Sequence, residues 1–452
     1  MPFPMPESPV PVLSRRSVLS ALSAWVLSGC GGGKSEEVAA QELVFFPVYG
    51  QSWALGFEAV PALSTTQRYN SLMLSTGVVP QALDQSAPQP AQALVPLVER
   101  SFVGTAGFPK MVGGETPAAG QAEMVQQMLR ADPQAGNRAA RYQVLSSAMG
   151  EGGRRIEALS RGTVYYERLL DQVRQALSLA RSAGLAFSVP AVAWVQNTAD
   201  TGFEVDGGTA AYPGLLHRLQ QDLDADVRRL TDQEQAVHLL NWQMFPDGQA
   251  VNSAGRVYAR HVLATDASAQ LHCCGPSYHL DQVTDQPGSV HLTAVSSKWL
   301  GAYLGLVYHR VVVQRQQWQP LRPLSVTVSG DRIVLKLHVP VAPLVFDVDR
   351  VALAQHFGFS VVAADGVTEL PLISVQLQQP DRVILQLSAT PPAGSLLRYA
   401  SQGDRQGRRS GIRGNLRDSQ GDRIVFDPQG LRLPMHNWCV CFEEPIHAAA
   451  SN

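Results

Sequence analysis

The stretch Phe45-Phe46-Pro47-Val48-Tyr49-Gly50-Gln51-Ser52-Trp53 is the most informative part of this chain. It is an apolar run that ends abruptly in Gly-Gln-Ser, which predicts a buried strand followed by a tight turn. A serine in that turn lies at the carboxyl edge of a sheet, where open α/β folds place ligands and reactive groups. Ser52 is therefore the first candidate for a reactive residue.

Composition limits the class of protein. The 452 residues leave room for two or three domains and a large core. Hydrophobic residues make up 45% and charged residues 16%, which is typical of a folded globular protein. The formal net charge of −2 gives no reason to expect nucleic acid or an anionic membrane surface as a partner.

The first 40 residues indicate an export signal and a tether rather than part of the fold. Ser14-Arg15-Arg16-Ser17-Val18-Leu19 leads into an apolar stretch, Val18 to Gly29, of about a dozen residues, whereas a membrane-spanning helix needs roughly 20. The stretch ends at Cys30 and resembles a bacterial lipoprotein signal, and its arginine pair is similar to that of a twin-arginine signal. We therefore expect lipidation of Cys30, a tether over 31–40, and anchoring in the bacterial cell envelope, on the periplasmic face or at the cell surface. The alternative is an ordinary secretory signal that contains a cysteine.

Two pairs of cysteines remain: Cys273 with Cys274, and Cys439 with Cys441. An exported protein meets oxidising conditions, so a disulfide between the pairs is allowed, although adjacent cysteines rarely bond each other. The C-C and C-x-C spacings lack the C-x₂-C pattern of zinc ligands. We expect disulfides or free thiols, with the pairing left open, and no metal or other cofactor.

Residues 41–315 alternate strand-like apolar runs with helical periodicity, which predicts an α/β domain with a parallel sheet. Beyond the run at Ser52, strands and helices are expected at 142–148, 164–183, 185–194, 213–230, 238–243, 253–264 and 269–273, with a last helix after His291. The Pro-, Gly-, Gln- and Ser-rich residues 62–120 fit this pattern poorly. They are expected to form long loops over the functional face.

Residues 320–452 change to a period of two, which predicts a small antiparallel β domain. Two hairpins are expected, with turns at Ser329-Gly330-Asp331 and Gln379-Pro380-Asp381. The stretch 402–424 has no apolar period and is interpreted as a mobile loop. The alternative is that its arginines contact an anionic glycan; these are Arg405, Arg408, Arg409 and Arg413.

Polar or glycine-rich segments follow the predicted strands. Met149-Gly150-Glu151-Gly152-Gly153 follows the strand at 142–148, and Trp194-Val195-Gln196-Asn197-Thr198-Ala199-Asp200 follows the strand at 185–194. Because the carboxyl ends of parallel strands share one edge of a sheet, these segments should converge with Ser52. His291 precedes a helix and is either a base for that serine or a capping or surface histidine. A nucleophile, a base and oxyanion donors are what ester hydrolysis by serine needs.

In this order the motifs resemble the SGNH (GDSL-like) hydrolases, in the branch of sialate O-acetylesterases and acetylxylan esterases. The resemblance covers about residues 41–310 and leaves the β region out. It implies a flavodoxin-like three-layer α/β sandwich with a parallel central sheet. It also implies Ser52 as nucleophile and His291 as base. The oxyanion donors that it implies are Ser52, Gly153 and Gln196.

Two positions depart from the family pattern. The Gln-Gly-Glu-x-Asp motif keeps only Gln196 and Asp200, and the aspartate expected three residues before the histidine is replaced by Gly288. Asp285 is then expected to be the acid that orients the imidazole, with Asp281 a poorer choice. A serine–histidine dyad without an acid is the alternative.

The sequence therefore favours a serine esterase that removes O-acetyl groups from a sugar or cell-envelope polysaccharide, with an acetylated glycan as its substrate. Two other hypotheses stay open. One is a glycan-binding lipoprotein without activity on the same fold, and the other is an esterase for simple acyl chains.

Overall fold

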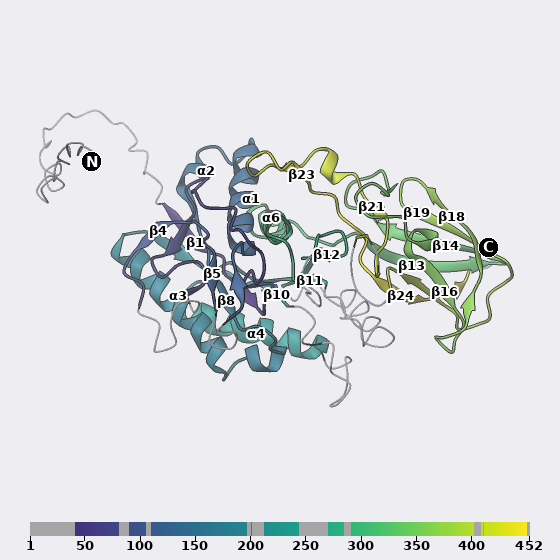
Figure 1. Cartoon of the computed structure of the whole chain (residues 1–452), viewed down its shortest axis with the longest axis horizontal. Helices are drawn as coiled ribbons and strands as arrows, with labels where there is room; N and C mark the ends of the chain where they lie inside the picture. Colours follow the sequence, from purple (N-terminus) through teal and green to yellow (C-terminus); the bar gives the residue numbers. More distant parts are fainter. Residues whose placement is uncertain are drawn as a thin grey trace, which may run out of the picture. The chain divides into compact units, whose positions relative to one another are not determined.

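The computed structural model describes residues 41–80, 90–104, 110–196, 200, 212–243, 270–283, 291–401, 408–409 and 411–449 (Figure 1). The expected export signal with Cys30, the helix expected at 253–264, Asp285 and Arg405 lie outside these residues. Among the described residues, no helix is both long and apolar enough to cross a membrane.

A parallel sheet lies at the centre of residues 41–315. Its strands are hydrogen-bonded in two sets, β4-β3-β7-β1-β9 and β12-β11-β10-β2-β8. The chain passes directly from one set to the other at three places: from β1 (Glu42–Phe45) to β2 (Val48–Gly50), from β7 (Tyr142–Leu145) to β8 (Ala148–Gly150) and from β9 (Ala186–Ser188) to β10 (Ala191–Val195). The remaining members are β3 (Leu72–Leu74), β4 (Leu94–Pro96), β11 (His238–Gln243) and β12 (Leu271–Pro276).

The order of these strands is that of a flavodoxin-like fold. With each directly continued pair counted as one strand, β7/β8, β1/β2, β9/β10, β11 and β12 follow the order 2-1-3-4-5. β3 adds a parallel strand beside β7, and β4 pairs antiparallel with β3. A short antiparallel pair, β5 (Phe102–Val103) with β6 (Val112–Gly113), lies outside this order. The expected parallel α/β fold is confirmed.

Each of the three long strands is broken, which the sequence did not predict. Pro47 lies between β1 and β2, and Pro190 lies between β9 and β10. Proline has no N–H for a ladder hydrogen bond, so it interrupts a strand that periodicity alone shows as continuous. The third break, between β7 and β8, falls at Ser146 and Ser147.

Helices cover both faces of the sheet and form the expected three layers (Figure 1). Alternate strand residues face different cores: Val44 and Val48 pack with α1 (Pro117–Ala131) and α6 (Ala294–Tyr308), whereas Phe45 and Tyr49 pack with α3 (Val164–Ser182) and α4 (Tyr212–Thr231). Helices α3 and α4 lie within one residue of their predicted bounds, and α6 begins after His291 as expected. The shorter helical elements are α2 (Arg138–Arg141), a 3₁₀ turn at Ile156–Leu159 and a π-helical turn at His309–Val313.

Helix α1 corrects the expectation of loops over 62–120, because it begins at Pro117. Thr116 caps it by accepting a hydrogen bond from the N–H of Ala118, and proline at the first position is a known start signal. The helix was missed because alanine and glycine, rather than large apolar residues, form much of its buried surface. These small residues allow close packing against α6: a Cβ on Gly301 would lie 2.1 Å from the carbonyl oxygen of Pro117.

We predict that Gly301→Ala lowers the free energy of unfolding by about 1–3 kcal/mol, because the added methyl group must push α1 away from α6. Urea unfolding measures this change. Gly214→Ala is the matched control, since a Cβ at Gly214 in α4 meets open space. The control should leave stability unchanged or raise it by up to about 1 kcal/mol. Equal effects of the two substitutions would contradict the packing argument.

The C-terminal residues form antiparallel sheets, as expected. One sheet has the order β18-β19-β14-β13-β25, and the expected hairpins are β13 (Arg322–Ser329) with β14 (Arg332–His338) and β18 (Leu372–Gln378) with β19 (Arg382–Leu387). The edge strand β25 (His447–Ala448) pairs parallel with β13. The second sheet consists of β17 (Glu369–Leu370), β16 (Phe359–Val362), β20 (Leu396–Tyr399) and β24 (Phe442–Pro445).

Smaller elements complete this region. β15 (Val345–Phe346) pairs with β21 (Leu416–Arg417), β22 (Val425–Phe426) pairs with β23 (Leu433–Pro434), and 3₁₀ turns lie at Gln355–Gly358 and Gln420–Asp422. The described residues of both regions belong to one compact unit. A boundary between domains at 41–315 and 320–452 stays a prediction.

The interpretation of 402–424 as a mobile loop was wrong for its second half. Asn415 and Asp418 are fully buried there. The Asn415 amide donates to the carbonyl oxygens of Asp347 and Val351, and Asp418 accepts from the N–H of Asn437. Polar side chains hold this segment in place, so the absence of an apolar period was misleading.

All four described cysteines are buried free thiols in this structure. Cys273 and Cys274 lie on β12, whereas Cys439 and Cys441 lie in the C-terminal segment. Burial raises the pKa of Cys273 to about 12 and that of Cys439 well above its ordinary value. These thiols are therefore poor nucleophiles as they stand.

His279 is buried among aromatic rings where the C-terminal segment meets α6. Its ring stacks on Trp438 at 5.2 Å and meets the edges of Trp299 and Tyr303. Neither ring nitrogen has a hydrogen-bond partner among the described residues. Burial, followed by the nearby positive charge of Arg350, holds the pKa of His279 well below its ordinary value. The folded protein therefore keeps this imidazole neutral.

We predict that His279 makes the protein less stable in acid. Its pKa is depressed on folding, so below the unfolded value of about 6.5 the unfolded chain binds the proton more tightly, and stability falls as pH falls. From pH 7.5 to pH 5, the free energy of unfolding measured in urea should fall by up to about 2 kcal/mol less in His279→Phe than in the wild type. His447→Phe, at an exposed histidine, should leave the loss unchanged. A loss in His279→Phe as large as in the wild type would contradict this account.

Candidate active site

Three neighbouring strands end at the same level. Gly50 at the end of β2 is in register with Gly150 of β8 on one side and with Val195 of β10 on the other. The segments that follow these strands therefore start from one edge of the sheet. The predicted convergence of Ser52, the Gly150 to Gly153 segment and Gln196 follows from this register.

Glycine is required at two of these strand ends. A Cβ on Gly50 would lie 1.9 Å from the carbonyl oxygen of Val195, and one on Gly150 would lie 1.7 Å from the carbonyl oxygen of Gly50. No other residue fits such close backbone contacts. The glycine of Gly-Gln-Ser is thus a packing requirement that brings the following turn close to its neighbours.

Ser52 begins a compact turn that runs to Phe57. The carbonyl oxygen of Ser52 accepts a hydrogen bond from the N–H of Phe57 at 3.1 Å, and that of Gln51 accepts one from the N–H of Leu55 at 3.2 Å. Ser52 is 7% exposed. The turn folds back on itself, so Phe57 lies beside Ser52 and Glu58 follows it directly.

His291 is paired with a carboxylate from this same segment. The Nδ1 atom of His291 lies 2.8 Å from an oxygen of Glu58, and both side chains are largely buried. The ring of Phe57 packs edge-on against the imidazole at 6.1 Å. A carboxylate on Nδ1 fixes the tautomer and directs Nε2 away from the acid, which is the arrangement that a base for serine requires.

Glu58 occupies an unusual backbone conformation. Its φ of 60° is left-handed, which is uncommon for a residue other than glycine. The N–H of Glu58 donates to the carbonyl oxygen of Val112 at 2.7 Å, which holds the backbone in place. Non-glycine residues in such conformations cluster at functional sites.

A buried charged cluster anchors the chain just after Glu58. The carboxylate of Glu115 accepts hydrogen bonds from the N–H groups of Leu63 and Ser64, and its own N–H donates to Ala59. The ammonium group of Lys298, from α6, lies 3.8 Å from this carboxylate. Burial raises the pKa of Glu115, and Lys298 opposes that shift. The cluster ties the Glu58 segment to the helix that begins after His291.

Neither acid expected from the sequence is seen beside His291. Asp285 lies outside the described residues, so its role stays a prediction. The carboxylate of Asp281 is engaged by Arg350 and Arg408. Glu58 was missed because the acids expected from the family pattern lie close to the histidine in sequence, whereas this one follows the serine by six positions. Its one visible signal was that no other acid lies between Ser52 and Asp84.

Gln196 and Asp200 form a structural staple. The Gln196 amide nitrogen donates to the carbonyl oxygen of Arg154 at 2.9 Å and to the carboxylate of Asp200, which also accepts from the N–H of Ile156. Burial raises the pKa of Asp200 to about 7. Because these two acceptors take both amide hydrogens of Gln196, its role as an oxyanion donor requires one of them to be released. That role stays a prediction, as does the role of the exposed Gly153.

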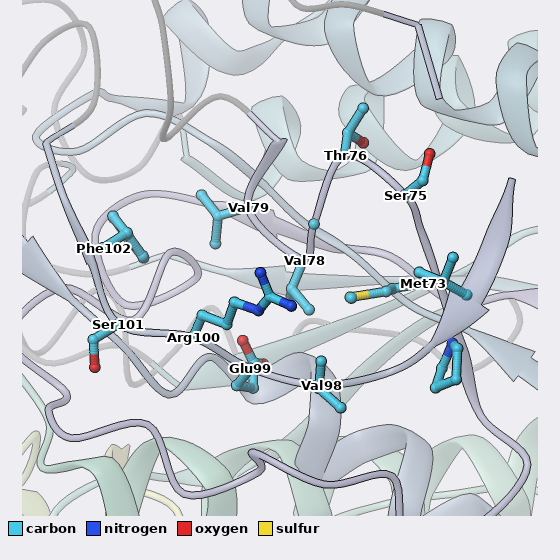
Figure 2. Close-up of a pocket in the computed structure, with 13 residues that line it drawn as sticks. Met73, Ser75, Thr76, Val78, Val79, Val98, Glu99, Arg100, Ser101 and Phe102 are labelled. Atoms are coloured by element: carbon cyan, nitrogen blue, oxygen red, sulfur yellow. The ribbon is translucent and has the colours of Figure 1, made fainter. Parts of the chain in front are cut away.

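A cavity of about 710 Å³ lies near the turn that runs from Ser52 to Phe57 (Figure 2). Its walls are largely apolar and include Met73, Val78 and Phe102. Arg100 also lines the cavity, and Figure 2 shows its guanidinium group among the lining side chains. The ring of Phe102 lies 6.4 Å from that of Phe57, which in turn contacts His291. The residues that line it include neither Ser52 nor His291, so the cavity adjoins the candidate site rather than forming it.

Two of the three described arginines do not favour the alternative of an anionic-glycan contact. Arg408 binds the carboxylate of Asp281, and Arg413 donates to the carbonyl oxygens of Ala352, Leu353 and Gly411. Both of these guanidinium groups are occupied by the protein itself. Arg409 is exposed, so a glycan contact at that position stays a prediction.

The fold and the segments just described define an α/β protein in which Glu58, from the turn that follows Ser52, is paired with His291. That His291 acts as the base for Ser52 stays a prediction. Comparison with models of known protein families gives no match. Comparison with curated proteins gives none either.

Comparison with solved structures does give matches. The chain is similar to a carbohydrate acetylesterase from Xanthomonas citri, with 16% identity and a TM-score of 0.50 over 88% of this chain and 80% of the other. It is also similar to NanS (12% identity, TM-score 0.40, 60% of this chain and 100% of the other) and to Est24, a carbohydrate acetylesterase from Sinorhizobium meliloti (10%, 0.30, 61% and 100%). The first of these likenesses shows the fold, and the expected resemblance in fold to SGNH-like esterases is confirmed.

Proposed function

We propose that this protein is a serine esterase that removes O-acetyl groups from a sugar or a cell-envelope polysaccharide. The observation that carries the proposal is the hydrogen bond between His291 and Glu58, because Glu58 lies in the segment that begins at Ser52. A shared fold with a carbohydrate acetylesterase supports the choice of a carbohydrate ester as substrate.

In this mechanism Glu58 holds the Nδ1–H of His291, and Nε2 takes the proton from Ser52 as its oxygen attacks the acetyl carbonyl carbon. The N–H groups of Ser52 and Gly153 bind the oxyanion, with the Gln196 amide as a third donor once it leaves one of its acceptors. Each such donor typically stabilises the transition state by about 3 kcal/mol. His291 then protonates the leaving sugar oxygen. Water, deprotonated by His291, cleaves the acetyl-enzyme and releases acetate.

We predict that Ser52→Ala lowers kcat for p-nitrophenyl acetate by at least about 10³-fold, because the acyl-enzyme can no longer form. Glu58→Gln should lower kcat by up to about 10⁴-fold, since an amide does not stabilise the imidazolium. Asp285→Asn is the discriminating control and should leave kcat within about twofold if Glu58 is the acid. Full activity in Ser52→Ala would reject the esterase mechanism, and loss in Asp285→Asn alone would reject Glu58.

A glycan-binding protein without activity is the second candidate. The observation in its favour is that both amide hydrogens of Gln196 are already occupied. The same variants separate the two hypotheses. For the esterase, we expect a fluorophosphonate probe to label the wild type but not Ser52→Ala. Acetate release from a panel of acetylated glycans then identifies the substrate and tests the third hypothesis, an esterase for simple acyl chains.

We also propose that the protein is exported and anchored through lipid on Cys30, as its first residues indicate. Lipid chains anchor through burial of their CH₂ groups, each worth about 0.8 kcal/mol. Mass spectrometry of the mature amino terminus is expected to find a diacylated cysteine. An unmodified terminus beyond Cys30 would contradict this.

A further inference from the structure

Two arginines from the C-terminal β region meet on one carboxylate next to the candidate site. Arg350 donates to one oxygen of Asp281 at 3.0 Å, and Arg408 donates to the other. The three side chains are between 20% and 32% exposed. Asp281 therefore uses both oxygens in charge-assisted hydrogen bonds, which are stronger than neutral ones.

The backbone of Asp281 is in turn joined to the segment that carries His291. The carbonyl oxygen of Asp281 accepts from the N–H of Thr293 at 3.0 Å, and the N–H of Val283 donates to the carbonyl oxygen of His291 at 2.9 Å. The N–H of Asp281 also donates to Ser296 in the first turn of α6. A displacement of Asp281 therefore moves the backbone at His291 and in the residues that follow it.

The two arginines are themselves held in place. Arg350 donates through Nε to the carbonyl oxygen of His279 at 2.9 Å, and its guanidinium group lies 4.8 Å from the ring centroid of Trp299 in α6. Arg408 donates to the carbonyl oxygen of Arg350 at 3.2 Å. The partners of Asp281 are thus cross-braced, and a fixed donor constrains position more effectively than a flexible one.

We propose that Asp281, Arg350 and Arg408 form a clamp through which the C-terminal β region positions His291. This inference rests on the proposed function, since it assigns Asp281 the role of a positioning residue for the base of the reaction. Half-exposed ion pairs contribute little to global stability, typically up to about 1 kcal/mol. The main effect of the clamp is therefore on the alignment of the imidazole with Glu58 and Ser52.

The test compares Asp281→Asn with a control of the same chemistry elsewhere. Asp226, in α4, also accepts from two arginines, Arg161 and Arg229. Asp281→Asn should lower kcat for p-nitrophenyl acetate by about 10- to 100-fold with KM unchanged, because small misplacements of a catalytic group have effects of this size. Asp226→Asn should leave both constants within about twofold. Asp281→Glu, which keeps the charge, should recover part of the loss.

A second readout does not depend on hydrolysis. The Nδ1 proton of His291, bound to Glu58, gives a downfield proton resonance that Glu58→Gln should abolish. Asp281→Asn and Arg350→Met should broaden or shift this resonance, whereas Asp226→Asn should not. The clamp is refuted if Asp281→Asn changes kcat no more than Asp226→Asn does, acts through KM alone, or leaves the resonance unchanged. A wild-type protein that hydrolyses no ester refutes the proposed function instead, and the resonance still decides the clamp.

Discussion

Backbone atoms meet at the ends of β8, β2 and β10 at distances that leave no room for side chains. The two glycines at Gly50 and Gly150 permit this contact, and the register of the three strands depends on it. Once the strands end level, the serine turn, the Gly150 to Gly153 segment and Gln196 share one edge of the sheet. The same serine turn carries Glu58 to His291, so the nucleophile candidate and the acid are positioned by one short stretch of chain. The placement of these segments thus follows from a packing constraint in the backbone.

The elements that could be predicted are those in which apolar periodicity is strong and local. Helices α3 and α4 have large buried residues at helical spacing, and both ends of each were predicted to within one residue. Helix α6 is buried on nearly all sides, and only its start after His291 was predicted. Helix α1 was missed because its tight contact with α6 selects small residues, which carry little periodic signal. The strand breaks at Pro47 and Pro190 were missed for a different reason. Hydrophobicity alone shows a continuous run, and only the register of neighbouring strands reveals the change of sheet.

The site was predictable only in part, and its acid shows why. Ser52 and His291 stand out because each follows a recognisable local pattern. Glu58 pairs with a histidine 233 positions away, and no spacing rule connects the two. Its left-handed φ is also invisible in sequence, since Glu58 is neither glycine nor asparagine. Gln196 shows the opposite case, a residue whose motif was recognised but whose contacts differ from the expectation. The motif was recognised, but the structure gives its amide nitrogen two acceptors within the protein, so a residue expected to bind the oxyanion also holds the adjoining segment in shape.

The electrostatics of Gln196 and Asp200 connect these roles. An ionised carboxylate accepts a hydrogen bond more strongly than a neutral carboxyl group does. Because burial raises the pKa of Asp200 to about 7, both forms are populated near neutral pH. The neutral form holds the Gln196 amide less firmly, and in the proposed mechanism this favours its release toward the oxyanion. The ionised form favours the staple that fixes the backbone at Arg154 and Ile156. In that mechanism, rigidity of this segment and availability of the donor are opposed, and protonation of Asp200 shifts the balance between them.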